Sequence, residues 1–496
     1  MKKVLIVGGG IGGLCTAIRL LKQGYKVTIL EKEKAIGGKV NIKIREGARF
    51  DLTASILMTP KIYTEIFDAV GKDYRDYFEL VKIDPVYRVN YSNGDRYDFY
   101  SDLSKMVRIL ESMQEGLSVE YLSFLSKSLE KYLYSKKYFL NKSMTNINDL
   151  ANIKTLKKMI DIRPFTTVNN YLQNTITNKQ LVEYIEFQSM YIGVNPYTNS
   201  NLYTLIPAIS HIYGLWYVKG GFYKYIEALE NVILELGGKI ETENNVEKIL
   251  VNKDKVVGVK SNRGIYKSNI VICNADYPYA INSLIKKGKN TKAKKVKKED
   301  YSCSTFIMYL GLNKKYSDLQ VHNIYIGENF RNNIESPFKG KIPENPSLYL
   351  YYPSKIDESI SGSFESILNV MVRVPNLQYK NIKWNKGNIN KFRNNIIRQI
   401  KNIKGLEHIE KEILYESYLT PIQLKYRFNS YNGTAFGLSH KLNQTTYFRP
   451  HIQEEDINGL YFIGSSTHPG NGVSVIIEGS KIISNKICKK YNNRNI

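Results

Sequence analysis

The sequence predicts an α/β protein of two interleaved domains, one of which is a Rossmann-like nucleotide-binding domain. Two junctions of strand, Gly-rich turn and helix support this prediction, one at the start of the chain and one close to its end. Between them, strand-like and helical blocks follow one another without a short repeat or a disordered linker. A chain of 496 residues suffices for two or three such domains.

The first junction consists of an apolar strand-like run, Val4–Val7, a turn of glycines and a helical pattern that stops near Gly24. The turn satisfies G-x-G-x-x-G with Gly8, Gly10 and Gly13. In this pattern the first glycine allows the tight turn, the second lets the backbone approach a pyrophosphate, and the third lets the helix lie close to the sheet. The helix N-terminus then offers free N–H groups and a partial positive charge to the phosphates.

A second strand-like run, Val27–Leu30, ends on Glu31, which lies 23 residues after Gly8. A carboxylate at the tip of the second strand can accept hydrogen bonds from ribose hydroxyls. A Gly-rich turn that binds nothing is the alternative. Because strand, glycines, helix, strand and acid all occur in the order and spacing of a dinucleotide site, the sequence predicts a bound dinucleotide.

Gly37-Gly38-Lys39 follows Glu31 after five residues. The pattern E-x5-G-G-R/K resembles the flavoprotein superfamily of amine oxidases, protoporphyrinogen oxidases and carotenoid desaturases. The resemblance implies that the paired glycines lie beside the phosphates of FAD and that the basic residue lies near them. Lys39 replaces the usual Arg, so the charge is kept while the bidentate fork is lost.

The cysteines and the hydropathy of the chain indicate where in the cell the protein is expected. Four scattered cysteines with no C-x-x-C pair predict neither a zinc site nor a disulfide framework, so we expect no bound metal and a reducing cytoplasm. Met1-Lys2-Lys3 and the apolar run after it look like a signal peptide, but the glycines explain this segment better. No apolar run approaches the ~20 residues of a membrane span. We therefore expect a cytoplasmic protein that at most lies on a membrane.

The net charge of +25 is concentrated most strongly between residues 286 and 298. The lysines of this basic cluster are Lys286, Lys287, Lys289, Lys292, Lys294, Lys295, Lys297 and Lys298. A solvated surface loop is the slightly favoured interpretation. Attraction to anionic lipid headgroups, at ~1 kcal/mol per basic residue near the surface, is the functional one. Charge alone permits nucleic-acid binding, but no recognised motif supports it, so we expect no nucleic-acid partner.

The middle of the chain contains helical and strand-like blocks. Residues from about Tyr63 to Gly214 are predicted to be mostly helical, and a helix over 222–236 is expected after the break at Gly220-Gly221. Strands are predicted over 246–251, 256–261, 269–276, 308–312, 347–352 and 367–374, and a helix over 389–403. The strand at 269–276 is the expected return of the chain to the nucleotide-binding domain.

The second junction consists of a strand over 460–463, a polar Gly-rich loop from Gly464 to Gly472, and an apolar helix over 473–487. A helix N-terminus aimed at the pyrimidine edge of a flavin would stabilise the anionic reduced ring. A second structural turn is the alternative, which the first junction disfavours.

The loop Gly464-Ser465-Ser466-Thr467-His468-Pro469-Gly470-Asn471-Gly472 resembles the G-x-x-T-H-P-G-x-G motif of bacterial-type phytoene desaturases. Nearly the whole chain is similar to this family, including Tyr191-Ile192-Gly193, Val218-Lys219-Gly220-Gly221 and Tyr447-Phe448-Arg449-Pro450. Together these segments are closest to the 4,4'-diapophytoene (dehydrosqualene) desaturases.

Some features depart from the desaturase pattern. Lys39 replaces Arg, Thr53-Ala54-Ser55 replaces a small G-P-[ST] turn, and Glu478 lies within the apolar last helix. Gly214–Val218 and Ser55-Ile56-Leu57 resemble a sister group, the carotenoid end-group oxygenases, which is the alternative within the family. Outside the family, the alternatives are a flavin amine oxidase with a soluble substrate and a membrane-binding protein that keeps FAD only structurally. An NAD-dependent dehydrogenase is a further alternative, which Gly37-Gly38 and the C-terminal motif disfavour.

The resemblance implies an FAD-dependent desaturase that introduces double bonds into an acyclic carotenoid precursor, 4,4'-diapophytoene or phytoene. It implies an FAD-binding domain of the flavin amine oxidase type, interleaved with a substrate domain of mixed sheet and a helical, membrane-associated cap. We expect FAD-binding segments at 1–75, 215–305 and 446–496, the cap at 76–214, and the sheet and helices of the substrate domain at 306–445.

The residues expected to bind FAD are Gly8, Gly10, Ile11, Gly12, Gly13, Glu31, Lys32, Gly37, Gly38, Lys39, Val246, Gly464, Gly472 and Val473. A base that removes a proton remains unassigned. His468 and Glu478 are candidates, although a loop hydrogen bond and an exposed helix face are the simpler interpretations. A long polyisoprenoid substrate dissolves in the bilayer, so we expect peripheral association with the inner face of the cell membrane. Quinone or oxygen is the expected electron acceptor.

Overall fold

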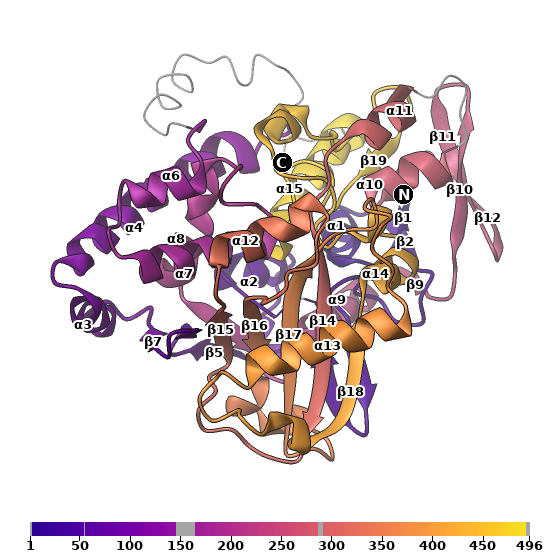
Figure 1. Ribbon diagram of the computed structural model, residues 1–496. Helices are drawn as coiled ribbons and strands as arrows, with labels where there is room; N and C mark the ends of the chain where they lie inside the picture. The colour runs from indigo at the N-terminus through magenta and orange to yellow at the C-terminus, as the bar shows by residue number, and fades with distance from the viewer. Residues whose placement is uncertain (1, 54, 145–163, 286–290, 493–496) are drawn as a thin grey trace.

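The computed structural model describes residues 2–53, 55–144, 164–285 and 291–492. Ala54, Lys286, Lys287 and Lys289, which the sequence analysis names, lie outside these ranges. Figure 1 shows a nucleotide-binding domain, a second sheet and a layer of helices. The nucleotide-binding domain is built on a five-stranded parallel sheet, in the order β19 (Leu460–Phe462), β13 (Val271–Cys273), β1 (Lys3–Val7), β2 (Lys26–Leu30) and β9 (Lys239–Glu241). Strands from separate stretches of chain form this sheet, which confirms the interleaved α/β architecture.

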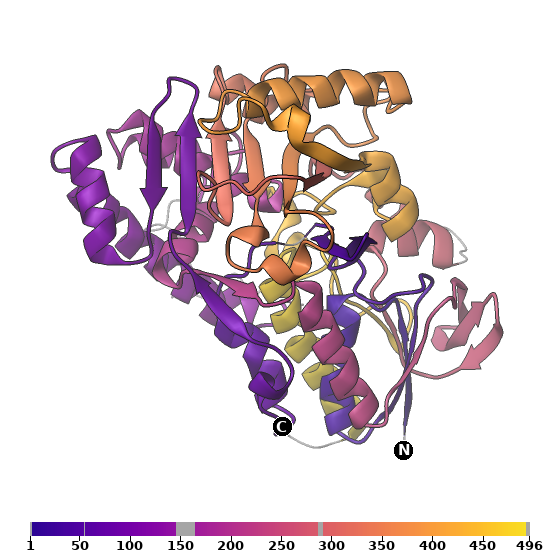
Figure 2. The same ribbon diagram turned by 90° about the horizontal axis from the view of Figure 1, so that it is seen from below.

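The central strand β1 is buried on both faces because its apolar side chains alternate between two cores. Val4 and Ile6 pack in the cluster that includes α1 (Ile11–Lys22), α9 (Tyr223–Glu235) and α15 (Val473–Asn492). Leu5 and Val7 pack instead with residues of β10 and β11. Figure 2 shows α1 lying between α9 and α15. The first Gly-rich turn is thereby fixed to the C-terminal helix.

The other face of the parallel sheet is covered by a three-stranded antiparallel sheet of β10 (Val246–Asn252), β11 (Lys255–Ser261) and β12 (Gly264–Lys267). Beyond it, Thr291–Lys298 forms helix α11. The prediction of a surface loop is therefore wrong for residues 291–298 of the basic cluster. Val296 is buried in the adjacent core, and Lys292 forms ion pairs with Glu454 and Asp456, which anchors the helix.

A seven-stranded mixed sheet forms the second domain, and its order is β18 (Ile413–Leu419), β14 (Ser304–Leu312), β17 (Ser366–Val374), β16 (Leu348–Tyr351), β15 (His322–Ile326), β6 (Tyr87–Tyr91) and β7 (Arg96–Phe99). Only β15 and β6 pair in parallel among these strands. Helix α13 (Lys386–Ile400) packs on one face (Figure 1), and its buried side chains belong to the same hydrophobic cluster as Val370 and Val372. Strand alternation places Met371 and Arg373 on the opposite face.

Three strands lie within the interval that the sequence analysis predicts to be mostly helical. They are β5 (Leu80–Ile83), β6 and β7, and β5 pairs with β8 (Leu215–Val218). The hairpin of β6 and β7 is stabilised by a bidentate pair between Arg88 and Asp98, which face each other across the strands. These strands are short, and β6 pairs with residues more than two hundred positions away, so helical periodicity could not reveal them.

The helical layer lies beside the mixed sheet (Figure 1). It consists of α3 (Leu103–Met113), α4 (Leu117–Ser135), a π-helical turn at Lys136–Leu140, α6 (Val168–Gln173), α7 (Lys179–Ser189) and α8 (Leu205–Ile212). Smaller elements elsewhere are β3 (Ile42–Arg45), β4 (Ala48–Asp51), α2 (Pro60–Asp68), α10 (Tyr277–Tyr279), α12 (Phe330–Glu335) and α14 (Pro421–Phe428). Among the residues that the structure describes, none of the helices combines the length and hydrophobicity that crossing a membrane requires.

Candidate functional site

The first Gly-rich turn connects β1 to α1, and its glycines meet constraints of backbone conformation or of space. Gly8 has φ of 96° and donates its N–H to the Leu30 carbonyl at 2.8 Å. A Cβ on Gly13 would lie 2.5 Å from the Gly8 carbonyl oxygen, so the start of the helix can approach the turn only because residue 13 is Gly. No side chain caps the N-terminus of α1. Its first-turn N–H groups are therefore available to an anionic ligand.

Glu31 and the paired glycines lie against this turn. The Gly9 N–H donates to Glu31 Oε2 at 2.7 Å, and the Glu33 N–H donates to Oε1 at 2.9 Å. Burial raises the pKa of Glu31, although these two hydrogen bonds oppose the rise. The Gly37 N–H donates to the Gly9 carbonyl at 2.7 Å. Two motifs that are separate in sequence thus form one wall.

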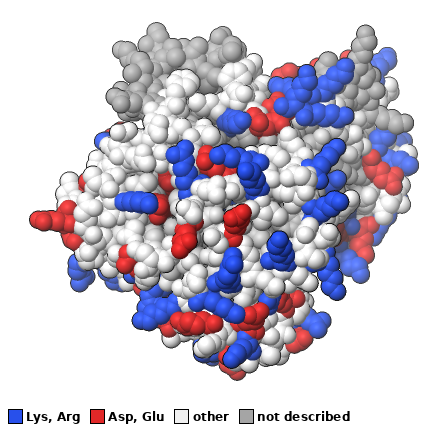
Figure 3. Space-filling model, in the orientation of Figure 1, with Lys and Arg blue, Asp and Glu red and all other residues white. Residues whose placement is uncertain are grey.

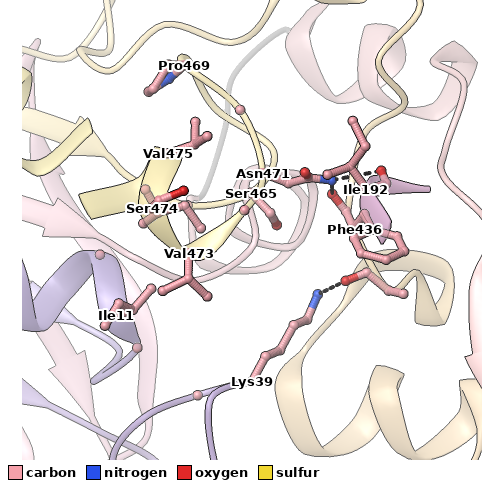
Figure 4. A pocket seen from close by; sticks show the side chains of 18 of the residues that line it. Ile11, Lys39, Ile192, Phe436, Ser465, Pro469, Asn471, Val473, Ser474 and Val475 are labelled. Atoms are coloured by element: carbon pink, nitrogen blue, oxygen red, sulfur yellow. Dashed lines mark hydrogen bonds between the residues drawn. The ribbon is translucent and has the colours of Figure 1, made fainter. Parts of the chain in front are cut away.

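The second Gly-rich loop ends at α15 and faces the same space. Gly464 and Gly472 have φ of 147° and 105°, values that favour glycine. A Cβ would lie 3.9 Å from the Asn274 carbonyl oxygen at Gly464 and 3.6 Å from Val475 Cγ2 at Gly472, so both positions have free space. Both glycines line the same cavity. Figure 4 shows Val473 at the start of α15 and Ile11 at the start of α1 beside this cavity. The N-termini of two helices therefore border one site.

Arg449 holds the second loop in place. Its buried guanidinium donates to five backbone carbonyls, those of Thr467, Ser439, Gln444, Leu438 and Ser465, at 2.5–3.3 Å. Burial lowers the pKa of Arg449 to about 10, so the side chain remains charged at neutral pH. In the sequence Arg449 is recognisable only as part of the segment Tyr447-Phe448-Arg449-Pro450, whereas in the structure its hydrogen bonds hold the loop in position.

Lys39 and Lys32, both predicted to bind FAD, donate hydrogen bonds to backbone carbonyls between residues 426 and 435. Lys39 Nζ donates to the Ala435 carbonyl at 3.0 Å, as Figure 4 shows, and burial lowers its pKa. Lys32 Nζ donates to the Tyr426 carbonyl at 3.0 Å. Val246 is buried at the start of β10. Of the predicted FAD-binding residues, all except Gly13 line a single cavity.

This cavity has a volume of about 870 Å³ and extends from the glycines into the helical layer. Its apolar wall beyond the glycines includes Ile56, Met58, Tyr132, Phe139, Leu140, Ile192, Ile206, Ile209, Met371 and Phe436. Phe165 and Phe448 also line it, and they are 86% and 49% exposed. These two aromatic side chains mark where the cavity reaches the surface, and we call this region the mouth.

His468 and Glu478 both line the cavity. His468 Nε2 donates to the Lys142 carbonyl at 2.6 Å, and burial lowers the pKa of the imidazole to about 4. The simpler interpretation of His468, a loop hydrogen bond, is confirmed. Glu478 is only 7% exposed, so the exposed helix face predicted as its simpler interpretation is wrong. Its Oε2 lies 3.4 Å from Lys481 Nζ.

Several cavity residues carry no sequence motif. Tyr349 on β16 and Arg373 on β17 reach it from the mixed sheet, and Tyr132 on α4 reaches it from the helical layer. An arginine within the apolar run Met371-Val372-Arg373-Val374 is the one signal that the sequence offers for them. Within the described ranges, no group of three or more His, Cys, Asp and Glu side chains could hold a metal ion.

Comparison with known proteins shows which family shares this sequence and fold. The profile of the family "Flavin containing amine oxidoreductase" matches residues 11–298. The chain is 33% identical over 486 residues to a 4,4'-diapophytoene desaturase (4,4'-diaponeurosporene-forming) of Staphylococcus haemolyticus, covering 97% of both chains. It is 32% identical over 495 residues to the same enzyme of Staphylococcus aureus, covering 98% of this chain and 99% of the relative. A triple mutant of putrescine oxidase shares the fold, with a TM-score of 0.64, 12% identity and 99% of both chains covered.

Proposed function

The chain belongs to the flavin-containing amine oxidoreductases and to their 4,4'-diapophytoene desaturases, and we propose that it introduces conjugated double bonds into 4,4'-diapophytoene. The observation that carries this proposal is one continuous cavity that joins two Gly-rich, helix-terminated loops to a long apolar wall. The names of both relatives favour desaturation over oxygenation of an end group.

FAD is the cofactor that the family implies, and the residues present fit it. Uncapped α1 offers N–H groups for phosphates, and Gly464 and Gly472 leave open the space that side chains would fill. We assign the adenosine and phosphates to the turn at Gly8–Gly13 with Glu31, Gly37, Gly38 and Val246. We assign the flavin ring to the loop that ends at Gly472 and Val473. Bound FAD supplies the acceptor for the hydrogen removed from the substrate.

The apolar wall performs most of the substrate binding. A polyisoprenoid has no polar group to recognise, so affinity comes from burial at ~25 cal/mol per Å² of apolar surface. The same wall excludes water from the allylic carbons. The second hydrogen leaves as a proton, and of the two candidates only Glu478 has a carboxylate in the cavity wall. Burial lowers the pKa of His468 to about 4, so its imidazole is a weak base, and its Nε2 donates to the Lys142 carbonyl.

We propose that the mouth docks on the inner face of the cell membrane, because the substrate dissolves in lipid. Phe165 and Phe448 expose apolar surface where the cavity opens. Figure 3 shows lysines gathered over α11, where Lys294, Lys295, Lys297 and Lys298 are exposed. Lys292 is engaged by Glu454 and Asp456 and is left out of this surface. Quinone or oxygen accepts the electrons afterwards.

Co-expression with a dehydrosqualene synthase tests the proposed reaction. Cells that make the colourless precursor should turn yellow to orange, and the pigment should have lost hydrogens in pairs without gaining oxygen. Products that gain oxygen at a terminal methyl with no new double bonds would assign the protein to the end-group oxygenases. Unchanged precursor, together with oxidation of added putrescine, would support the amine-oxidase alternative.

A further inference from the structure

Arg373 is a cation in the wall of a cavity that is otherwise suited to a hydrocarbon. It lies on the face of β17 opposite to α13, together with Met371, and both line the cavity. Its guanidinium carbon lies 4.7 Å from the ring centre of Phe436, so the flat cation stacks on an aromatic ring. Figure 4 shows Phe436 in the same cavity, beside Ile192.

No counter-charge accompanies this guanidinium. Among the described residues, none accepts a hydrogen bond or forms an ion pair with it, whereas Lys39 nearby donates to the Ala435 carbonyl. The ionisable side chains that act on Arg373 are Cys303, Tyr191 and Tyr349. Burial raises the pKa of all three, so they are neutral at neutral pH. A guanidinium does not lose its proton in a protein, and a half-buried one without a counter-charge is costly.

We propose that Arg373 receives the carboxylate of a long-chain acid, whose apolar tail lies along the cavity wall. A carboxylate supplies the missing charge and matches the guanidinium fork with two parallel hydrogen bonds. The cavity that Arg373 shares with Phe165 and Phe448 has apolar lining residues, Met371 and Phe436 among them, that accommodate the tail. A free fatty acid and a polyene that has been oxidised to an acid at its end share this chemistry.

This inference adds a class of ligand to the proposed function and does not depend on which polyene is desaturated. Such an acid would occupy the space of the hydrocarbon and compete with it. A hydrocarbon can still lie against this wall, because the guanidinium packs on the Phe436 ring and is more weakly hydrated than an ammonium group.

The test is calorimetric titration of the FAD-loaded protein with dodecanoate and, for comparison, with its methyl ester, which has the same tail and no charge. Crocetin, a linear polyene diacid, distinguishes an end-oxidised polyene from a fatty acid as the better ligand. We expect wild type to bind dodecanoate about tenfold or more tightly than the ester, as hydrogen bonds to charged groups do. Equal affinity for acid and ester in wild type would overturn the proposal, whatever any variant does.

Arg373→Met should weaken dodecanoate binding about tenfold or more and leave ester binding unchanged. Arg331→Met is the matched control, because the Arg331 guanidinium carbon lies at the same distance of 4.7 Å from an aromatic ring, that of Tyr197, but its side chain is exposed on α12 and does not line the cavity. Unchanged dodecanoate affinity in Arg373→Met would contradict the proposal. Loss of FAD from Arg373→Met would assign the guanidinium to the cofactor and overturn it as well.

Discussion

The turn between β1 and α1 shows how strictly single residues fix the nucleotide site. The distance of 2.5 Å between an ideal Cβ on Gly13 and the Gly8 carbonyl excludes any side chain at position 13. Gly13 itself does not line the cavity, which agrees with its predicted role in packing the helix against the sheet. Gly10 does line the cavity, so substitution there should act on the ligand directly.

Gly10→Val tests the phosphate assignment. The Cβ would lie 2.8 Å from Asn274 Nδ2, and the branched methyl groups would enter the cavity. We expect FAD affinity to weaken about tenfold or more, because such an overlap costs about 1–3 kcal/mol. Flavin absorbance of the purified protein measures it. Gly387→Val is the control, since its Cβ would make an ordinary 3.6 Å contact in α13. Wild-type flavin content in Gly10→Val would refute the assignment.

Glu478→Gln tests the candidate proton acceptor. Gln keeps the size of the side chain and removes its basicity, so desaturation should slow by about 10²-fold while FAD content stays the same. Lys481→Met removes the ion-pair partner at 3.4 Å and leaves the carboxylate in place, so its rate should remain much closer to wild type. If Glu478→Gln desaturates as fast as wild type, Glu478 is not the base.

At the scale of elements, the loop between β19 and α15 depends on one side chain from outside it. Arg449→Met would leave the five carbonyl groups that this residue serves without their donor. We expect unfolding to become easier by about 3 kcal/mol or more, with loss of FAD, because buried acceptors without partners are costly.

Arg398→Met is the control for Arg449→Met, because Arg398 is exposed and its guanidinium donates to the side chains of Asn395 and Asn345. Its effect should stay within about 0.5 kcal/mol. Thermal unfolding, followed together with flavin release, compares the two variants. Equal behaviour of both would show that Arg449 does not brace the loop.

The sequence predicted best those elements whose signals are local. Both Gly-rich junctions lie where their short patterns place them, because strand, turn and helix are contiguous in the chain. The strands β5, β6 and β7 escaped prediction because each has only four or five residues. In addition, β5 and β6 pair with strands far away in the sequence, and β7 pairs, among the described strands, only with β6. The helix α11 was not predicted, because its sequence is mostly lysine and only one residue, Val296, is buried in the core.

The candidate site divides in the same way. Its nucleotide end could be predicted because glycines, helix termini and Glu31 recur at fixed spacings. Its substrate end could not, since Tyr349 and Arg373 enter from strands that meet the glycines only in the folded chain. Sequence alone also gave no means of telling that Glu478 is buried, because one carboxylate in an apolar helix is compatible with either face.

At the scale of the whole molecule, membrane docking is tested with vesicles. Changing Lys294, Lys295, Lys297 and Lys298 to Gln should reduce co-sedimentation with anionic vesicles and leave neutral vesicles nearly unaffected. Salt should weaken the lysine contribution, given a Debye length of ~10 Å at 0.1 M, and spare the apolar contribution of Phe165 and Phe448. Equal binding by wild type and variant would show that α11 is a solvated helix with no part in membrane binding. Failure of wild type to bind any vesicle would contradict delivery of substrate from the membrane.

The central claim is that a flavin in this cavity oxidises a polyisoprenoid. Anaerobic mixing of the FAD-loaded protein with 4,4'-diapophytoene in vesicles tests it most directly, with flavin absorbance and product mass followed in the same sample. We predict that one flavin is bleached for each double bond formed and that the product keeps all its carbon and gains no oxygen. A flavin that stays oxidised in the presence of the polyene, or that is bleached only by an amine, would contradict the claim.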